Sequence, residues 1–219
     1  KGNISREQLI RLMVGRDVLQ IERSIQTSDK VLLEVRELSG DGFNNITFKL
    51  KEGEILGLAG LIGAGRTEIA KAIFGISQKA GEVLIHNTRA KITHPSEALR
   101  NGIAYLPEER KSLALFEQMS VTDNIVSANL ELSQNILYDQ KACAELARQF
   151  TKKLRIASTS ENQKALHLSG GNQQKVVLAR CLATSPEILI VDEPTHGIDV
   201  GSKEEIYHIL NTIALQGKG

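Results

Sequence analysis

The chain of 219 residues has no tryptophan, few aromatic residues and almost no charge surplus, with 27 Lys and Arg against 26 Asp and Glu. The resulting net charge of +1 argues against a nucleic-acid-binding protein, whose affinity would come from a basic surface. Its two cysteines, Cys143 and Cys181, lie too far apart for a metal-ligand pair or a redox dithiol, which predicts reduced thiols. The longest uncharged stretch, 55–65, is short and glycine-rich, so no segment is expected to cross a membrane.

What the sequence does contain is the composition of a globular domain, with 41% hydrophobic and 24% charged residues. The chain starts without methionine or an apolar signal core and is expected to be a fragment of a longer polypeptide. Ser5 and Gln8 have the spacing of a capping box and predict a short helix that ends at Gly15. Because a polar stretch follows, residues 1–30 are interpreted as a linker helix and connector, and residues 31–219 as the main domain.

The apolar pattern of the main domain predicts an α/β fold. Residues 46–50 alternate apolar and polar side chains, as a half-buried antiparallel strand does, whereas 188–191 is entirely apolar, as a buried parallel strand is. Residues 139–155 carry apolar side chains at helical spacing and predict an amphipathic helix. The remaining strands are predicted at 31–35, 55–59, 82–86 and 103–106, and the remaining helices at 67–74 and 122–130.

A glycine-rich loop between the predicted strand and helix has the context of a phosphate-binding loop. Glycines let backbone amides converge on phosphate oxygens, the helix start adds positive potential, a basic side chain reaches the terminal phosphates and a hydroxyl ligates Mg²⁺. Arginine stands where the motif has lysine, which leaves hydrolysis at this loop open. The alternative is a glycine-rich turn that packs a strand on a helix. The residues assigned to nucleotide binding are Gly60, Gly63, Ala64, Gly65, Arg66, Thr67 and Glu68, with Thr67 also a metal ligand.

Two acidic residues, Asp192 and Glu193, end the predicted buried strand 188–191. The first carboxylate could bind the water shell of Mg²⁺, and the second could polarise an attacking water, so Glu193 is the predicted catalytic residue. An acidic pair at a solvated strand end is the alternative, and the phosphate-binding loop upstream makes it less favoured.

The segment Leu168–Lys175, Leu-Ser-Gly-Gly-Asn-Gln-Gln-Lys, directly precedes an apolar helix. Serine and glycine amides at a helix start form an anion site, and an N-capped helix with nothing bound is the alternative. The order of phosphate loop, this motif, acidic strand and the Asp199 segment resembles the ABC ATPases from Val31 to the end. The resemblance implies a P-loop NTPase fold of the ABC ATPase type with an antiparallel β subdomain and a helical subdomain at about 108–168, truncated at the C-terminus. It also implies ATP and Mg²⁺ as cofactors, and contacts to a nucleotide held by the opposite domain of a dimer from Ser169, Gly170, Gly171, Asn172 and Asp199.

The sequence resembles more closely the second cassette of tandem importers for ribose, galactose and xylose. The matching stretches are Met13–Arg16, Gly57–Glu68, Ser169–Lys175 and Glu193–Gly201. The sequence departs from that pattern at His196, where arginine is expected, and at Glu108, where ABC ATPases usually have glutamine. The resemblance implies that Glu108 reaches the metal shell, and that the switch histidine of the family lies beyond Gly219.

The resemblance implies an ATPase that couples ATP binding and hydrolysis to monosaccharide uptake from the cytoplasmic face of the cell membrane. Its implied partners are an upstream ATPase domain of the same chain, transmembrane permease subunits and, indirectly, a sugar-binding protein, with no nucleic acid. The intact signature would complete the first cassette's site, while the altered phosphate loop would hydrolyse slowly, so the chain alone is expected to be weak or inactive. A non-hydrolysing regulatory module and the ATPase half of a nucleoside importer remain alternatives, whereas a DNA-repair ATPase lacks support.

Overall fold

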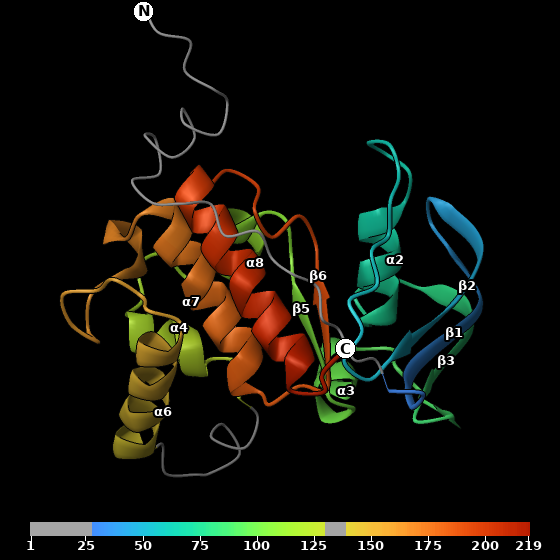
Figure 1. The fold of residues 1–219 in the computed structure, drawn as a ribbon, viewed down its shortest axis with the longest axis horizontal. Coiled ribbons are helices and arrows are strands. Elements are labelled where there is room, and N and C mark those ends of the chain that lie inside the picture. Colours follow the sequence, from blue (N-terminus) through green and yellow to red (C-terminus); the bar gives the residue numbers. More distant parts are fainter. Residues whose placement is uncertain (1–27, 130–138) are drawn as a thin grey trace, which may run out of the picture.

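The computed structural model describes residues 28–129 and 139–219, and the described chain divides into a sheet side and a helical side (Figure 1). The predicted linker helix and the stretch 13–16 lie outside the described residues. Among the described residues, no helix is long and apolar enough to cross a membrane. The strands are β1 (Val31–Gly40), β2 (Phe43–Lys51), β3 (Lys79–Ile85), β4 (Thr88–Arg89), β5 (Ile103–Leu106) and β6 (Ile188–Val191). The helices are α2 (Arg66–Ile73), α3 (Pro95–Arg100), α4 (Val121–Val126), α6 (Gln140–Lys153), α7 (Gly170–Ala183) and α8 (Val200–Leu215), with a π-helical turn η1 (Arg110–Ala114) and a 3₁₀ turn η2 (Ala165–His167).

An antiparallel sheet of order β2-β1-β3-β4 forms the sheet side. The prediction of a half-buried antiparallel strand at 46–50 is confirmed, because Phe48 on β2 pairs with Val35 on β1. On its other side, Val35 pairs with Val83 on β3. The buried face of this sheet packs with α2, whose apolar residues Ile69 and Ile73 join the same hydrophobic cluster. The predicted helix at 67–74 is therefore confirmed, and it is held against the sheet by its apolar stripe.

Two parallel strands, β5 and β6, lie between the sheet side and the helical side. Because successive side chains of a strand point to opposite faces, each strand contributes to both hydrophobic clusters. Ile103 and Ile188 belong to the cluster under the antiparallel sheet, whereas Ala104 and Leu106 belong to the cluster under the helices. The carboxyl end of β6 is thereby fixed between two cores, and Asp192 follows it directly.

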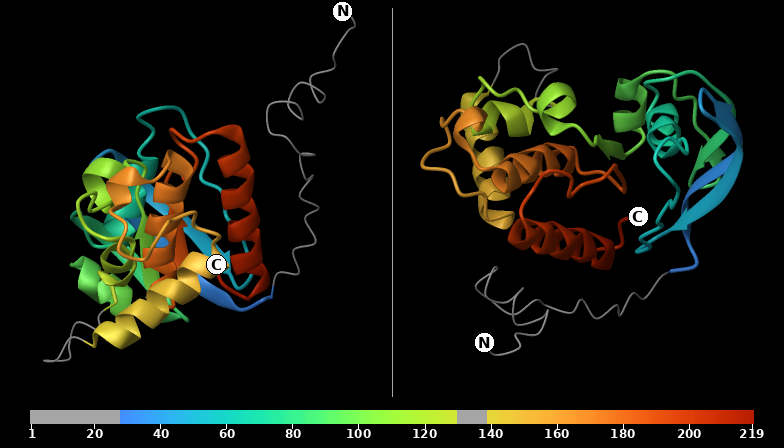
Figure 2. Two further views of the ribbon diagram at one scale, coloured as in Figure 1. Left: turned by 90° about the vertical axis from the view of Figure 1, so that its left-hand side faces the viewer. Right: turned by 90° about the horizontal axis from the view of Figure 1, so that it is seen from above.

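The helical side consists of α4, α6, α7 and α8, which lie on one side of the parallel strands in the right-hand view of Figure 2. Buried polar groups connect these helices as well as apolar ones. The Arg180 guanidinium donates to the Asn124 carbonyl and to its side-chain Oδ1, both at 2.8 Å, and burial lowers the pKa of Arg180. Asn124 is fully buried and also bonds both backbone groups of Phe116. Cys143 and Cys181 are buried free thiols.

The prediction of a strand at 55–59 is wrong. The backbone there is irregular, and Ile55, Leu56 and Leu58 are exposed along a groove of about 740 Å³ whose opposite wall includes β6. A strand needs a neighbour that takes up its backbone hydrogen bonds, and an apolar pattern alone does not supply one. One edge of β6 pairs with β5. On the described chain, Gly219 bonds at the other edge: its N–H donates to the Glu187 carbonyl, and its carbonyl accepts from the Leu189 N–H.

Candidate nucleotide site

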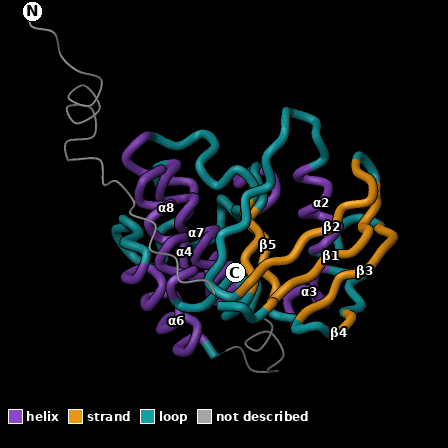
Figure 3. Tube along the Cα trace, turned by 45° about the vertical axis from the view of Figure 1, so that its right-hand side comes forward, coloured by secondary structure: helices purple, strands orange, loops and turns teal. Residues whose placement is uncertain are grey.

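The phosphate loop (residues 60–67) runs into the first residues of α2, and its stretch 60–64 is an exposed turn above that helix (Figure 3). Two of its glycines adopt backbone conformations that other residues rarely take, with φ of +80° at Gly63 and +85° at Gly65. Gly65 also has no room for a side chain, because a Cβ atom there would lie 2.5 Å from the Gly42 carbonyl oxygen. Gly65 is the N-cap of α2 and provides no side-chain hydrogen bond to the helix start. The first-turn amides of α2 are thus directed toward the loop, which suits an anion.

Arg66, the first residue of α2, forms an ion pair with Glu193. The guanidinium Nη1 lies 3.0 Å from Glu193 Oε1, although the residues are 127 positions apart in sequence. Glu193 has a φ of +43°, an uncommon conformation for a residue other than glycine and one found repeatedly at functional sites. The fold therefore joins the predicted phosphate-binding cation to the predicted catalytic carboxylate.

Asp192 is buried at the end of β6 and accepts a hydrogen bond from the Tyr105 hydroxyl at 3.3 Å. Burial raises the pKa of Tyr105, and the Asp192, Glu108 and Glu68 carboxylates raise it further. The phenol therefore stays protonated and can act as a donor. Tyr105 is not among the site residues predicted from the sequence. Tyr105 lies near the carboxyl end of β5, and this position points to the site only once β5 is known to pair in parallel with β6.

Glu108, predicted as a metal ligand, lies near His196, and both residues depart from the family pattern. Its Oε1 is 3.9 Å from His196 Nδ1, an ion pair only when the histidine is protonated. Arg110 extends from the same loop and donates to the carbonyls of His196 and Gly197 at 3.1 and 3.4 Å. The loop that follows β5 is thus bonded to the loop that follows β6.

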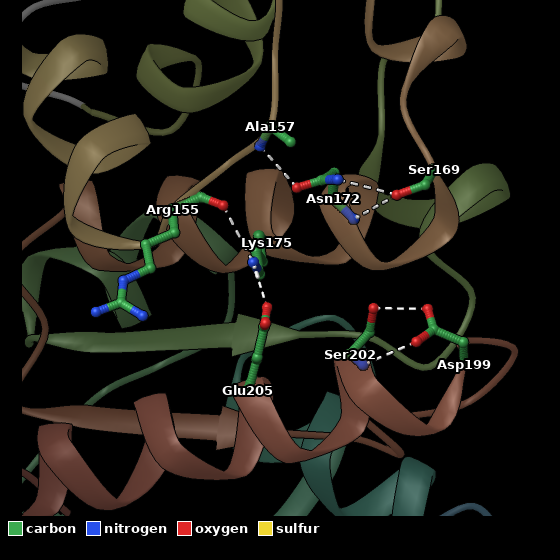
Figure 4. Close-up of polar contacts among 8 residues, drawn as sticks. All are labelled: Arg155, Ala157, Ser169, Asn172, Lys175, Asp199, Ser202 and Glu205. Carbon is green, nitrogen blue, oxygen red and sulfur yellow. Dashed lines mark hydrogen bonds and ion pairs between the residues drawn. The ribbon is translucent and has the colours of Figure 1, made fainter. Parts of the chain in front are cut away.

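The signature motif (Leu168–Lys175) spans the start of α7 (Figure 4). Ser169 is the N-cap, and its hydroxyl accepts from the backbone N–H and the side-chain amide of Asn172 at 3.4 and 2.9 Å. Gly170 and Gly171 are the first helical residues. Ser169 is exposed, and the helix dipole adds positive potential at this end of α7, a setting that suits an anion. The predicted contact of these residues with a nucleotide stays a prediction.

Asp199 begins α8 in the same manner. Its carboxylate accepts from the backbone N–H of Ser202 at 2.9 Å and from the Ser202 hydroxyl at 2.6 Å, and these hydrogen bonds lower the pKa of Asp199. The start of α8 lies directly against that of α7, because a Cβ atom on Gly171 would be 2.1 Å from Ser202 Oγ. The signature residues and Asp199 therefore form one continuous region.

The predicted site residues form two groups in the described structure. The first contains the phosphate loop, Asp192, Glu193 and Glu108, and the second contains the start of α7 and Asp199. Across residues 28–129 and 139–219, no hydrogen bond or ion pair joins 60–68 to 169–172. The two glycine-containing helix starts, of α2 and α7, therefore belong to different groups.

The first group fits a nucleotide in its exposed glycine loop, its uncapped helix start and the cation at Arg66. The same group offers Mg²⁺ the Thr67 hydroxyl and the Asp192 carboxylate, oxygen ligands that this ion prefers. Among the described residues, no three His, Cys, Asp or Glu side chains gather closely enough to hold a metal ion. The ion would therefore need phosphate oxygens and water as further ligands.

The fold is that of ATP-binding cassettes. It matches a nucleotide-free ATP-binding cassette from an ABC transporter with a TM-score of 0.73 at 20% identity, over 86% of this chain and 79% of the other. It matches a dimeric cassette in a post-hydrolysis state with ADP and Pi with a TM-score of 0.71 at 22% identity, over 85% of each chain.

The chain belongs to the ABC transporter family, whose model matches residues 43–196. It is 42% identical to the xylose import ATP-binding protein XylG of Thermoanaerobacter pseudethanolicus, over 99% of this chain and 45% of that protein. It is 45% identical to the ribose import ATP-binding protein RbsA of Clostridium tetani, over 98% of this chain and 43% of that protein. The chain thus spans less than half the length of these curated relatives, and the predicted family is confirmed.

Proposed function

We propose that this chain is the second of two ATP-binding cassettes in a monosaccharide importer, where ATP binding and hydrolysis drive sugar uptake. The observation that carries the proposal is the identity of 42–45% with xylose and ribose import ATP-binding proteins, which extends over nearly all of this chain. The match covers less than half of each relative, which leaves room in the same polypeptide for another cassette of similar size.

In this proposal the two groups of site residues serve different nucleotides. Ser169, Gly170 and Gly171 present their helix-start amides to the γ-phosphate of a nucleotide on the first cassette, with Asn172 and Asp199 beside them. Support comes from the completed cap on α7 and from its direct contact with the start of α8. The signature side of this chain is thereby ready to bind an anion without rearrangement, which is the condition for effective electrostatic stabilisation.

The phosphate loop of this chain holds the second nucleotide and hydrolyses it slowly or not at all. Thr67, Asp192 and Glu108 would hold Mg²⁺, which when bound neutralises phosphate charge. Glu193 is the group that would polarise water, but in the described structure its carboxylate is engaged by Arg66 at 3.0 Å. The pair would have to open before Arg66 could bind a phosphate or Glu193 could act on water.

Closure of the two cassettes on ATP and opening after hydrolysis would move transmembrane permease subunits on the cytoplasmic face of the membrane. A sugar-binding protein would deliver the substrate to those subunits without touching this chain. Uptake of labelled ribose, xylose, galactose and a nucleoside by the assembled transporter identifies the cargo. If only the nucleoside is taken up, the protein is the ATPase half of a nucleoside importer and the sugar proposal is wrong.

A matched pair of substitutions at Ser169 tests the trans role of the signature. Ser169→Asp keeps an N-cap for α7 but places a carboxylate in the anion site, whereas Ser169→Asn keeps the cap without charge. In the complete importer ATPase, we expect Ser169→Asp to lower kcat about a hundredfold and Ser169→Asn to stay within about fivefold of wild type. Equal activities of the two variants would refute the proposal. Gly171 is unsuitable for this test, because any side chain there collides with Ser202 within the same chain.

A non-hydrolysing regulatory module is the second candidate, and the Arg66–Glu193 pair favours it. The two candidates differ in whether the phosphate loop binds nucleotide at all. Titration of the chain with Mg-ATP decides between them: saturation at about millimolar nucleotide or below supports a working second site. Absence of binding at that concentration supports the regulatory module.

A further inference from the structure

Lys175 is a buried lysine to which the proposed function gives no role. Its side chain is 7% exposed, although a buried ammonium is costly unless it is paired and hydrogen-bonded. Its Nζ lies 2.6 Å from Glu205 Oε2 and donates to the Arg155 carbonyl at 3.1 Å (Figure 4). One cation on α7 is therefore bonded both to α8 and to the segment that follows α6.

The contact with Arg155 is the second of two between α7 and that segment. Asn172 lies three residues before Lys175, which places the two side chains on one face of the helix. The side-chain Oδ1 of Asn172 accepts from the Ala157 backbone N–H at 2.8 Å, while its amide donates to Ser169 Oγ at 2.9 Å. The segment 155–157 is thus attached to α7 at Asn172 and again one turn further along, at Lys175 (Figure 4).

The contact with Glu205 is likewise the second of two, this time between α7 and α8. The first is the close approach of Gly171 to Ser202, where a Cβ atom would lie 2.1 Å from Ser202 Oγ. Lys175 lies four residues after Gly171, and Glu205 lies three residues after Ser202. Since each helix is held at two points about one turn apart, neither helix can rotate or slide against the other without breaking a contact.

We propose that Lys175 is a positioning residue that holds the start of α7 in register with Asp199 at the start of α8 and with the segment 155–157. This inference rests on the proposed function, in which both helix starts face one nucleotide. A small displacement of either start would misplace amides or carboxylate against the γ-phosphate, and misplacement of about 1 Å can cost a large factor in rate. The residue acts through Ser169 and Asp199 and does not touch the nucleotide.

Lys175→Met tests the inference because methionine fills similar space and bonds neither partner. In the complete importer ATPase, we expect kcat to fall about tenfold while KM for ATP stays within about twofold. Lys175→Arg, which keeps a cation within reach of Glu205, should recover activity to within about threefold of wild type. Glu205→Gln keeps a side-chain oxygen that can accept from Lys175 at a partly exposed position, so it should give a smaller loss than Lys175→Met.

Two controls separate positioning from general destabilisation. Ile125→Val removes one methylene from the same helical core and lowers the melting temperature without touching the network. Lys152→Met removes a lysine charge from an exposed position on α6. Both should keep kcat. A loss in Ile125→Val as large as that in Lys175→Met at equal melting temperature would overturn the positioning role.

Failure of the inference can be told from failure of the proposed function. If Ser169→Asp abolishes ATPase activity and Lys175→Met and Glu205→Gln do not reduce it, only the inference fails. If Ser169→Asp is harmless, the proposed function fails, and amide hydrogen exchange of this chain decides the inference. We expect Lys175→Met and Glu205→Gln to speed exchange of the Ala157 amide and of the first turn of α8, and unchanged exchange at both places would overturn it.

Discussion

The starts of α2 and α7 are both glycine-rich and both suit an anion, but they are built differently. The start of α2 has no side-chain cap, and the loop before it exposes Leu61 and Ile62 at 85% and 100%. The start of α7 is capped by Ser169, lies against α8 at Gly171, and is followed by a helix buried along nearly its whole length. A loop with few contacts can be organised by its ligand, whereas a braced helix start is organised by the protein itself.

The charged groups at the two starts differ in the same way. Arg66 and Glu193 form a pair of partly exposed side chains, at 33% and 46%, which solvent screens and a ligand can separate. Lys175 is buried between two elements, and loss of its partners would leave an unpaired charge in the interior. The difference suggests that the signature side is permanent architecture and that the phosphate-loop side has more than one state.

Alanine at one glycine of each start is expected to give the largest contrast. Gly171→Ala should lower the free energy of unfolding by about 3 kcal/mol, because its Cβ atom overlaps Ser202. Gly63→Ala meets no atom within 4 Å but has a φ of +80°, so it should cost only about 1 kcal/mol. Denaturant unfolding of the chain measures both. Adding Ser202→Gly to Gly171→Ala should restore about 1 kcal/mol or more, and no recovery would contradict a collision between α7 and α8.

On the phosphate-loop side, the free energy of unfolding should depend on pH through Lys79, which bonds the end of α2. Lys79 donates to the Ala72 and Ile73 carbonyls, and burial lowers its pKa to about 8 from an ordinary 10.5. Between these values the unfolded chain binds the proton more tightly, so the free energy of unfolding should rise with pH from about 8 to 10.5. The group is partly exposed, so we expect a rise of about 1 kcal/mol after solvent screening.

Denaturant unfolding at several pH values, compared between the wild type and Lys79→Met, isolates this contribution. The methionine variant should lack the rise. Lys152→Met, on the exposed side of α6, is the matched control and should keep it. An identical pH profile for the wild type and Lys79→Met would show that Lys79 is fully solvated in the folded chain.

A double-mutant cycle at Arg66 and Glu193 should give the smallest effect. If nucleotide must separate the pair, Glu193→Gln should raise Mg-ADP affinity about threefold by releasing Arg66, as expected for an exposed ion pair. In an Arg66→Gln background the same change should have less effect. Calorimetric titration of the chain measures all four affinities, and an equal gain in both backgrounds would attribute it to repulsion between Glu193 and phosphate alone.

Elements whose boundaries are set locally were predicted well from the sequence. The strand 188–191 and the helix start at Ser169 are where apolar runs and capping residues placed them. The strand expected at 55–59 is absent, because strand formation depends on a neighbour that an apolar run does not specify. The confirmed family and fold thus follow from motifs in sequence order, while one of the strands does not.

Contacts between distant segments account for the other limits of prediction. Tyr105 reaches Asp192 only because β5 pairs in parallel with β6, and Lys175 finds Glu205 thirty residues downstream across a helix interface. Neither pairing has a sequence spacing that can be read in one chain. The predicted roles of Glu193 and Glu108 remain predictions, although the ion pair with Arg66 gives Glu193 a physical partner that the sequence did not indicate.

In the proposed importer, hydrolysis by the complete ATPase would use the signature motif of this chain and not its phosphate loop. Steady-state ATPase activity of the complete protein that carries Glu193→Gln tests this most directly. We expect activity within about twofold of wild type, because the carboxylate that is removed serves a site with little turnover. A loss of about a hundredfold, as expected for removing a general base, would contradict it.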